Sequence, residues 1–356
     1  MYSLDEILRM SVEEKASDIH FTAGCPPYYR IDGVLTPLKG DKLQPTDLEA
    51  LLLPILDNRH RNELETNGQT DLAYAIPGVG RFRVNVYKQR GTLASAMRCL
   101  PFSIPDADSL GIPAEVQALN RLSKRGLVLV TGPTGSGKST TLASLVDIMN
   151  RKYPYHIITL EDPIEYLHRH QYSMVNQREI GSDSNDYAQA LRAALREDPD
   201  VILVGEMRDL ETISTALTAA ETGHLVLSTL HTIGADKTID RIIDVFPPNQ
   251  QQQVRIQLAS VLECIISQQL IRREDGRGRV AALEVLFANT AIRNMIRENK
   301  TYQIISTMQT GKRQGMQTMD DAIYELFLRG DISADSAVSY AQKPGEMSGK
   351  VNFDMP

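Results

Sequence analysis

The pattern of hydrophobic and polar positions divides the chain into parts of different character. Over residues 81–87, Phe82, Val84 and Val86 alternate with polar positions, which predicts a half-buried strand. Residues 93–100 continue the alternation as a partner strand, and this arrangement places Arg83 and Arg98 on one face. Capping-box patterns at residues 3–6 and 46–49 each predict the start of a helix. Residues 1–100 are therefore expected to form an α+β domain.

A different pattern begins at residue 126, where short apolar runs alternate with helical periodicity. The runs that predict strands of a parallel sheet are 127–131, 156–160, 201–204, 225–229 and 280–287. A long helix is predicted from the spacing of Val254, Leu258, Val261, Leu262 and Ile265. We therefore expect an α/β fold overall, with an α/β domain over 126–290 and a helical region over 291–343. Residues 101–125 contain three prolines and predict a linker, and the polar residues 344–356 predict a flexible tail.

Composition narrows the class of protein. Of the 356 residues 42% are hydrophobic, which suits a globular chain, and a net charge of −7 argues against nucleic acid or anionic lipid as a partner. No apolar run approaches the roughly 20 residues of a membrane helix, and the acidic N-terminus does not resemble a secretory signal. Cys25, Cys99 and Cys264 are far apart without a CxxC pair, so a reducing cytoplasm is expected.

Residues 132–139 match every position of the phosphate-binding P-loop pattern, directly after an apolar strand and before a helical pattern. The matching residues are Gly132, Pro133, Thr134, Gly135, Ser136, Gly137, Lys138 and Ser139. Glycines free the backbone N–H groups to surround phosphates, and the helix N-terminus adds positive potential. Lys138 is expected to reach the terminal phosphates, Ser139 to ligate Mg²⁺, and Thr140 to join the nucleotide-binding set. The sequence thus predicts ATP and Mg²⁺ as cofactors.

A carboxylate, Glu206, ends the apolar strand 201–204 after one intervening residue. Gly205 stands where many P-loop enzymes carry an Asp that holds Mg²⁺. Glu206 is nevertheless well placed to polarise a water for in-line attack on a phosphate. The alternative is a strand-end glutamate that only pairs with Arg208.

An acidic cluster follows the strand 156–160. Carboxylates at the C-terminal end of a parallel strand face the ligand crevice of such a sheet. Glu161 and Asp162 are therefore expected to hold Mg²⁺, partly through water, and Glu165 is counted with the catalytic residues. A solvated cluster of loop charges is the simpler alternative.

Two histidines and two arginines complete the candidate residues. His224 and His231 bracket the strand 225–229 at its two ends, so they cannot share one zinc ion. Taken alone, each is expected to be an ordinary histidine without a catalytic role, although an imidazole beside a phosphate can donate a hydrogen bond. Arg83 and Arg98 share a sheet face, and paired arginines bind phosphate well, especially across an interface. The alternative is that the two arginines simply lie on a solvated sheet face, which is common, and bind no phosphate.

Together these residues resemble the secretion ATPase superfamily of type II secretion and type IV pilus motors. The segments that carry the resemblance are 16–20, 81–85, 132–139, 160–165, 195–200, 206–209, 220–224 and 231–232. The resemblance implies a PAS-like N-terminal domain, a RecA-like P-loop ATPase domain and a cytoplasmic homo-hexamer. It also implies catalytic roles for His224 and His231, nucleotide contacts from Arg83 and Arg98, and an inner-membrane pilus platform protein as partner.

Within that superfamily the chain is most similar to the motors that retract type IV pili. It has no room for the extra N-terminal domain of assembly motors and lacks their four-cysteine zinc site. Residues 291–298 resemble the C-terminal signature helix of retraction motors, and their spacing predicts that Arg293 and Arg297 are displayed on a polar face. The alternatives are a pilus-assembly or type II secretion motor, a RecA-like nucleic-acid motor, and a nucleotide-binding scaffold without turnover.

Overall fold

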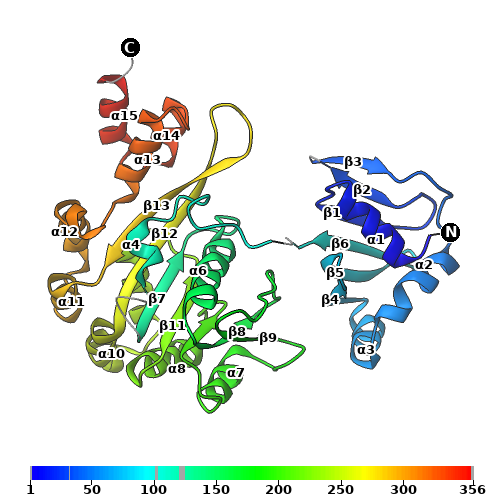
Figure 1. The fold of residues 1–356 in the computed structure, drawn as a ribbon, viewed down its shortest axis with the longest axis horizontal. Helices are drawn as coiled ribbons and strands as arrows, with labels where there is room; N and C mark the ends of the chain where they lie inside the picture. The colour runs from blue at the N-terminus through cyan, green and yellow to red at the C-terminus, as the bar shows by residue number, and fades with distance from the viewer. Residues whose placement is uncertain (1, 32, 101–102, 120–124, 354–356) are drawn as a thin grey trace. The chain divides into compact units, whose positions relative to one another are not determined.

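A computed structural model describes residues 2–31, 33–100, 103–119 and 125–353 of the chain. The chain forms two compact units, Met1–Ser103 and Ile104–Pro356. Each unit has its own sheet and its own buried core (Figure 1). The fold is mixed α/β, as the sequence predicts.

The first unit is built on a six-stranded antiparallel sheet. Its strand order is β3-β2-β1-β6-β5-β4. The strands are β1 (Asp18–Phe21), β2 (Tyr28–Ile31), β3 (Val34–Pro37), β4 (Gln69–Ile76), β5 (Gly80–Gln89) and β6 (Thr92–Cys99), and the helices are α1 (Leu4–Glu13), α2 (Pro45–Leu52) and α3 (Asn58–Asn67). The capping box at Ser3 and Glu6 is confirmed. The second was misplaced by two residues, because the Asp47 carboxylate accepts from the backbone N–H of Gln44 and the helix starts at Pro45.

The side chains of strand β5 alternate between an apolar face and a polar face of the sheet. Phe82, Val84 and Val86 are fully buried in the core of this unit. On the opposite face Arg83 is the register partner of Arg98 on β6, so the predicted shared face is confirmed.

The second unit is built on a seven-stranded sheet of order β13-β12-β7-β11-β10-β8-β9. The strands are β7 (Gly126–Thr131), β8 (His156–Glu161), β9 (Met174–Glu179), β10 (Val201–Val204), β11 (Leu225–Leu230), β12 (Leu262–Arg272) and β13 (Arg279–Phe287). All neighbours run parallel except β12 and β13, which pair antiparallel.

Helices cover both faces of this second sheet (Figure 1). They are α4 (Ala114–Gln117), α6 (Lys138–Lys152), α7 (Tyr187–Ala194), α8 (Leu210–Glu221), α9 (Ala235–Asp244), α10 (Pro248–Val261), α11 (Thr290–Arg297), α12 (Ile304–Thr310), α13 (Met319–Leu328), α14 (Ala334–Tyr340) and α15 (Pro344–Phe353). The central strand β7 alternates between two cores, with Leu127 and Leu129 in one and Val128 and Val130 in the other. Burial on both faces explains why these strands read as continuous apolar runs.

Three sequence expectations differ from the structure. Part of the expected linker packs onto the second unit, because Ala107, Ile112 and Val116 are buried in its core; residues 101–102 and 120–124 lie outside the described residues. The long helix ends at Val261, and the chain continues as strand β12. The expected flexible tail forms α15, whose Met347 is buried against α13 and α14; residues 354–356 are not described.

Helix α11 is held to its neighbour by one arginine. Arg293 donates to the carbonyl oxygens of Ala259 and Ser260, each at 2.8 Å, and to the Glu263 carboxylate at 2.9 Å. These contacts satisfy carbonyls at the end of α10. The expectation that Arg293 is displayed was therefore wrong, whereas the Arg297 side chain donates to Asn294 of its own helix.

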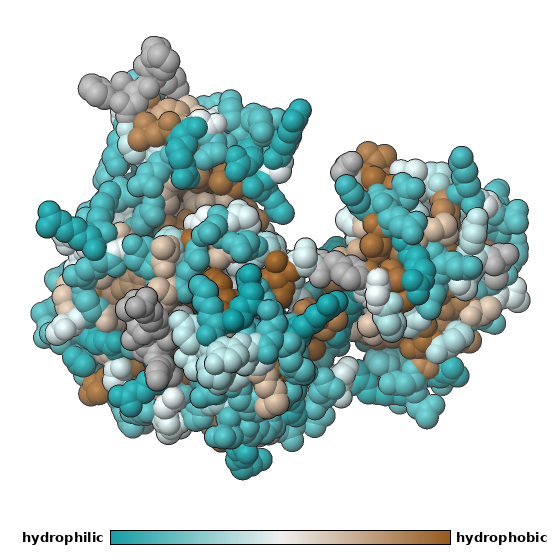
Figure 2. Space-filling view, viewed as in Figure 1, coloured by the Kyte–Doolittle hydropathy of each residue, from teal (hydrophilic) through white to brown (hydrophobic). Residues whose placement is uncertain are grey.

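The face of the molecule shown in Figure 2 is mainly hydrophilic, with small scattered hydrophobic areas. Among the described residues no helix combines the length and the apolar character that crossing a bilayer requires.

Candidate functional site

The P-loop connects the end of β7 to the start of α6. Gly132 has a φ of 142°, and a Cβ there would lie 2.2 Å from the carbonyl oxygen of Gln268, so only glycine fits. Gly137 has a φ of 90° and immediately precedes α6. The loop is therefore a close-packed backbone turn at a helix N-terminus, which is the geometry that binds phosphate.

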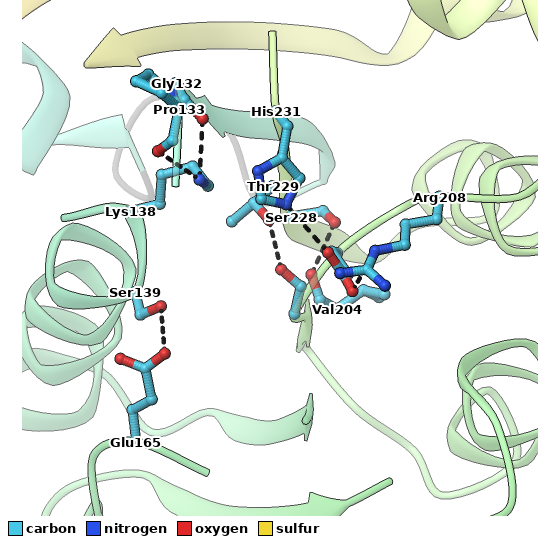
Figure 3. A network of polar contacts seen from close by, with 12 residues as sticks. Gly132, Pro133, Lys138, Ser139, Glu165, Val204, Arg208, Ser228, Thr229 and His231 are labelled. Atoms are coloured by element: carbon cyan, nitrogen blue, oxygen red, sulfur yellow. Dashed lines mark hydrogen bonds and ion pairs between the residues drawn. The ribbon is translucent and has the colours of Figure 1, made fainter. Parts of the chain in front are cut away.

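Lys138 folds back over this loop (Figure 3). Its ammonium donates to the carbonyl oxygens of Gly132 at 2.9 Å and Pro133 at 3.1 Å. Burial lowers the pKa of Lys138, and the carboxylates of Glu206 and Glu165 act in the opposite direction. A buried cation between backbone amides and two acids suits a polyphosphate ligand.

Three parallel strands end beside the P-loop and bring their following residues together. Glu206 follows β10, and its Oε2 atom lies 3.2 Å from Nε2 of His231, which follows β11. Its other carboxylate oxygen pairs with Nε of Arg208 at 2.6 Å. Only 16% of the Glu206 side chain is exposed. Glu206 thus does more than pair with Arg208, because it also contacts His231 and lines the cavity described below.

The acidic cluster after β8 divides into two environments. Glu165 accepts a hydrogen bond from the Ser139 hydroxyl at 3.0 Å. Glu161 instead accepts from Thr159 at 2.6 Å and Gln177 at 3.1 Å, and burial raises its pKa. Both hydrogen bonds fall on Oε1 of Glu161, and the residue lines the same cavity as Asp162 and Glu165, so its expected role in holding Mg²⁺ stays a prediction.

The oxygen atoms of Ser139, Asp162 and Glu165 are hard donors of the kind that Mg²⁺ prefers, and all three residues line one cavity. In the described ranges no three His, Cys, Asp or Glu residues are grouped to hold a metal ion by themselves. These residues fit an ion held mainly by substrate phosphates and water, with one or two protein oxygens.

The cavity has a volume of about 490 Å³. The predicted residues that line it are Thr134, Gly135, Gly137, Lys138, Ser139, Thr140, Glu161, Asp162, Glu165, Glu206 and His231. The sequence reasoning missed Tyr187, Thr229 and Arg279, which also line it. Tyr187 starts helix α7, and nothing in its local sequence marks it as a site residue.

His224 does not join this cavity. It precedes β11, whereas His231 follows it, and its Nδ1 atom lies 3.0 Å from the carbonyl oxygen of Ala219. A six-residue strand spans about 20 Å, so His224 is remote from the P-loop of its own chain. The expected catalytic role of His224 is therefore not supported within one subunit.

Arg83 and Arg98 belong to the first unit. Nε of Arg98 lies 3.0 Å from the Asp18 carboxylate, while 68% of the Arg98 side chain remains exposed. Burial alone would raise the pKa of Asp18, but hydrogen bonds from Ser17 and Arg98 outweigh it and lower that pKa. The two guanidinium groups thus form a solvent-exposed basic pair.

Comparison with known proteins identifies the family. Residues 2–337 match the model of the type II/IV secretion system protein family. The chain is 47% identical to a type IV pilus retraction ATPase, PilT, of Pseudomonas aeruginosa, covering 96% of this chain and 98% of that one. It is 45% identical to a twitching motility protein of Neisseria gonorrhoeae, covering 98% and 92%.

A solved structure agrees with these sequence relatives. The crystal structure of the pilus retraction motor PilT with bound ADP superposes with a TM-score of 0.91 at 53% identity, covering 97% of this chain and 99% of that one. The P-loop, the Glu206–His231 pair and these relatives agree, and the chain belongs to the type II/IV secretion system protein family.

Proposed function

We propose that this protein is an ATP-hydrolysing motor that powers the retraction of type IV pili. The observation that carries the proposal is the cavity that Lys138, Glu206 and His231 share, in a chain nearly half identical to retraction ATPases over almost its whole length. Hydrolysis would drive pilus depolymerisation.

The site's residues divide the work of hydrolysis. The P-loop N–H groups and Lys138 bind the phosphates, and Glu206 accepts a proton from the attacking water. His231 and Arg208 hold the Glu206 carboxylate in place through its two oxygens. Bound Mg²⁺, near Ser139, Glu161, Asp162 and Glu165, would neutralise phosphate charge as it does in other P-loop enzymes. A nucleotide-binding scaffold without turnover would not need a general base at the position of Glu206.

The proposal also includes the domains and the oligomeric assembly of the motor. The first unit is a PAS-like domain and the second a RecA-like domain, and six chains form a ring. Arg83 and Arg98 are the exposed basic pair that reaches a bound nucleotide across a domain or subunit interface. The motor acts in the cytoplasm on a platform protein of the inner membrane, and cycles of ATP move the two units against each other.

Deleting the gene tests retraction against assembly. A strain that lacks a retraction motor keeps surface pili that no longer shorten, and fluorescently labelled pili show this directly. Restoring the wild-type gene should restore shortening, whereas a Glu206→Gln gene should not. Loss of all surface pili in the deletion strain would instead show an assembly or secretion motor. Stimulation of ATP hydrolysis by DNA would indicate a nucleic-acid motor.

A further inference from the structure

Gly205 and Tyr187 fit together at the end of strand β10. A Cβ atom built on Gly205 would lie only 2.7 Å from the Tyr187 hydroxyl oxygen, well inside a normal contact. Gly205 is also clamped, because its N–H donates to Leu160 O at 2.8 Å and its carbonyl accepts from the Thr229 hydroxyl at 2.6 Å. The tyrosine hydroxyl therefore occupies the space into which a side chain at position 205 would project.

That position matters because it directly precedes Glu206. In many P-loop enzymes the corresponding strand end carries an aspartate, and the absence of a side chain at 205 leaves a gap in the site. Both Tyr187 and Gly205 line the cavity that contains Lys138 and Glu206. A polar group from helix α7 thus fills the gap from the side.

The Tyr187 hydroxyl is available to a ligand. Among the described residues no protein group hydrogen-bonds to it, although the tyrosine is partly buried. Burial raises the pKa of Tyr187, and the nearby carboxylates of Asp162 and Glu206 raise it further. The phenol accordingly stays neutral at physiological pH, and its oxygen can accept a hydrogen bond while it keeps its own proton.

We propose that Tyr187 takes the place of the missing strand-end side chain and positions the attacking water for Glu206. The water donates one hydrogen to Glu206 and the other to the Tyr187 oxygen, which leaves a lone pair for the terminal phosphorus. The water oxygen then bonds to phosphorus, the bond to the bridging oxygen breaks, and the proton passes to Glu206. Tyr187 keeps its own proton. This proposal rests on the ATP hydrolysis proposed above.

Tyr187→Phe in the full-length protein tests the role, because it removes only the oxygen. We expect kcat for ATP to fall at least tenfold, with KM and the affinity for a fluorescent ADP analogue within twofold of wild type. Tyr172→Phe is the matched control, since that side chain is 63% exposed, and it should hydrolyse ATP at the wild-type rate. A purely structural role of Tyr187 would instead lower the melting temperature and change ADP affinity together with kcat.

Gly205→Ala provides a second, independent comparison. Its Cβ should displace the Tyr187 hydroxyl, so kcat should fall to nearly the level of Tyr187→Phe. Combining the two changes should cost little more than either alone, because both remove the same contact. Wild-type kcat in Tyr187→Phe, or losses that multiply in the double variant, would overturn the role of Tyr187. A wild-type protein that bound ADP without hydrolysing ATP would overturn both this inference and the proposed function.

Discussion

Nε2 of His231 lies 3.2 Å from Oε2 of Glu206, although the two residues follow different strands and are 25 positions apart. The contact exists because β10 and β11 are parallel neighbours in register, so their carboxyl ends meet at one edge of the sheet. Arg208 pairs with the other oxygen of the same carboxylate. The orientation of Glu206 is therefore set from two sides.

Replacing His231 with Asn should test how much of that orientation the imidazole provides. Asn is too short to reach Oε2 from the same backbone position, so Glu206 would be held by Arg208 alone. We expect kcat to fall by about tenfold to a hundredfold, within the range of general base catalysis, with nucleotide affinity retained. The matched control is His224→Asn, which should keep the wild-type rate if His224 has no role at the site. Equal losses of kcat in the two variants would contradict the assignment of His231, and not His224, to the site.

Arg83→Ala and Arg98→Ala should each lower ATP hydrolysis without unfolding the second unit. Arg98→Ala removes an ion pair with Asp18 in which the arginine side chain is 68% exposed, a contact worth about 0–1 kcal/mol. Steady-state ATPase rates and the melting temperature measure the two effects separately. Lys88→Ala, an exposed cation elsewhere on β5, is the control and should change neither. Unchanged ATPase rates in both arginine variants would refute their contact with nucleotide.

The two arginines of helix α11 should behave differently. Arg293→Ala removes three hydrogen bonds that tie α11 to the end of α10, and we expect it to destabilise the protein by about 2 kcal/mol. Asn294→Ala with Arg297→Ala should shift stability by less than about 0.5 kcal/mol, because both lie on the helix surface. Urea denaturation followed by circular dichroism measures the difference.

The same surface variant tests whether α11 couples hydrolysis to retraction. We expect the Asn294→Ala, Arg297→Ala protein to hydrolyse ATP in solution at the wild-type rate, yet to fail to retract pili in cells. Parallel loss of both activities would place the helix in the catalytic machinery. Normal retraction would leave α11 as a packing helix only.

His168 makes stability depend on pH. Burial lowers its pKa to about 4, a shift that nearby Asp147 only partly opposes. Since an unfolded histidine titrates near 6.5, the unfolded chain binds a proton between pH 6.5 and 4 that the folded chain does not. The free energy of unfolding should therefore decrease as the pH is lowered from 6.5 to 4, by at most about 3 kcal/mol from this residue. Above pH 6.5 the contribution of His168 should not change with pH.

Urea titrations of wild type and His168→Asn at pH 7.5 and pH 4.5 test this dependence. The comparison of the two proteins removes the contribution of other titrating groups. The variant should lose less stability on acidification than wild type, and identical losses would show that His168 does not titrate in this way.

Local patterns predicted the parts of the site that local chemistry determines. The P-loop follows from one short motif, and Glu206 from its place after an apolar strand. Parallel pairing of β10 with β11 then explains why His231 joins the site and His224 does not. Tyr187 could not be found in this way, because it reaches Gly205 from a helix that the sequence does not mark as part of the site.

The errors in the fold have similar causes. Val261, Leu262 and Ile265 fit helical spacing, but the chain turns into a strand at Leu262 because it can pair there with β7. Helix α15 is short and weakly periodic, so only tertiary contacts such as the burial of Met347 reveal it. Glu161 and Glu165 look equivalent in sequence, and hydrogen bonds from Thr159, Gln177 and Ser139 distinguish them.

Lys138→Ala should affect binding where Glu206→Gln affects chemistry. Lys138 lies over the loop that surrounds the phosphates, so its loss should weaken the affinity for ADP and ATP. Titration with a fluorescent nucleotide analogue measures this, and Lys152→Ala at the other end of α6 is the control. Wild-type affinity in Lys138→Ala would contradict the placement of the phosphates.

The most direct test of the account is the ATPase rate of Glu206→Gln, measured together with its nucleotide affinity. The amide keeps the size of the side chain but cannot accept a proton from water. We predict wild-type affinity for ATP and a loss of about 10²–10⁴-fold in kcat. Turnover close to wild type in this variant would show that Glu206 is not the base and would contradict the mechanism proposed for this site.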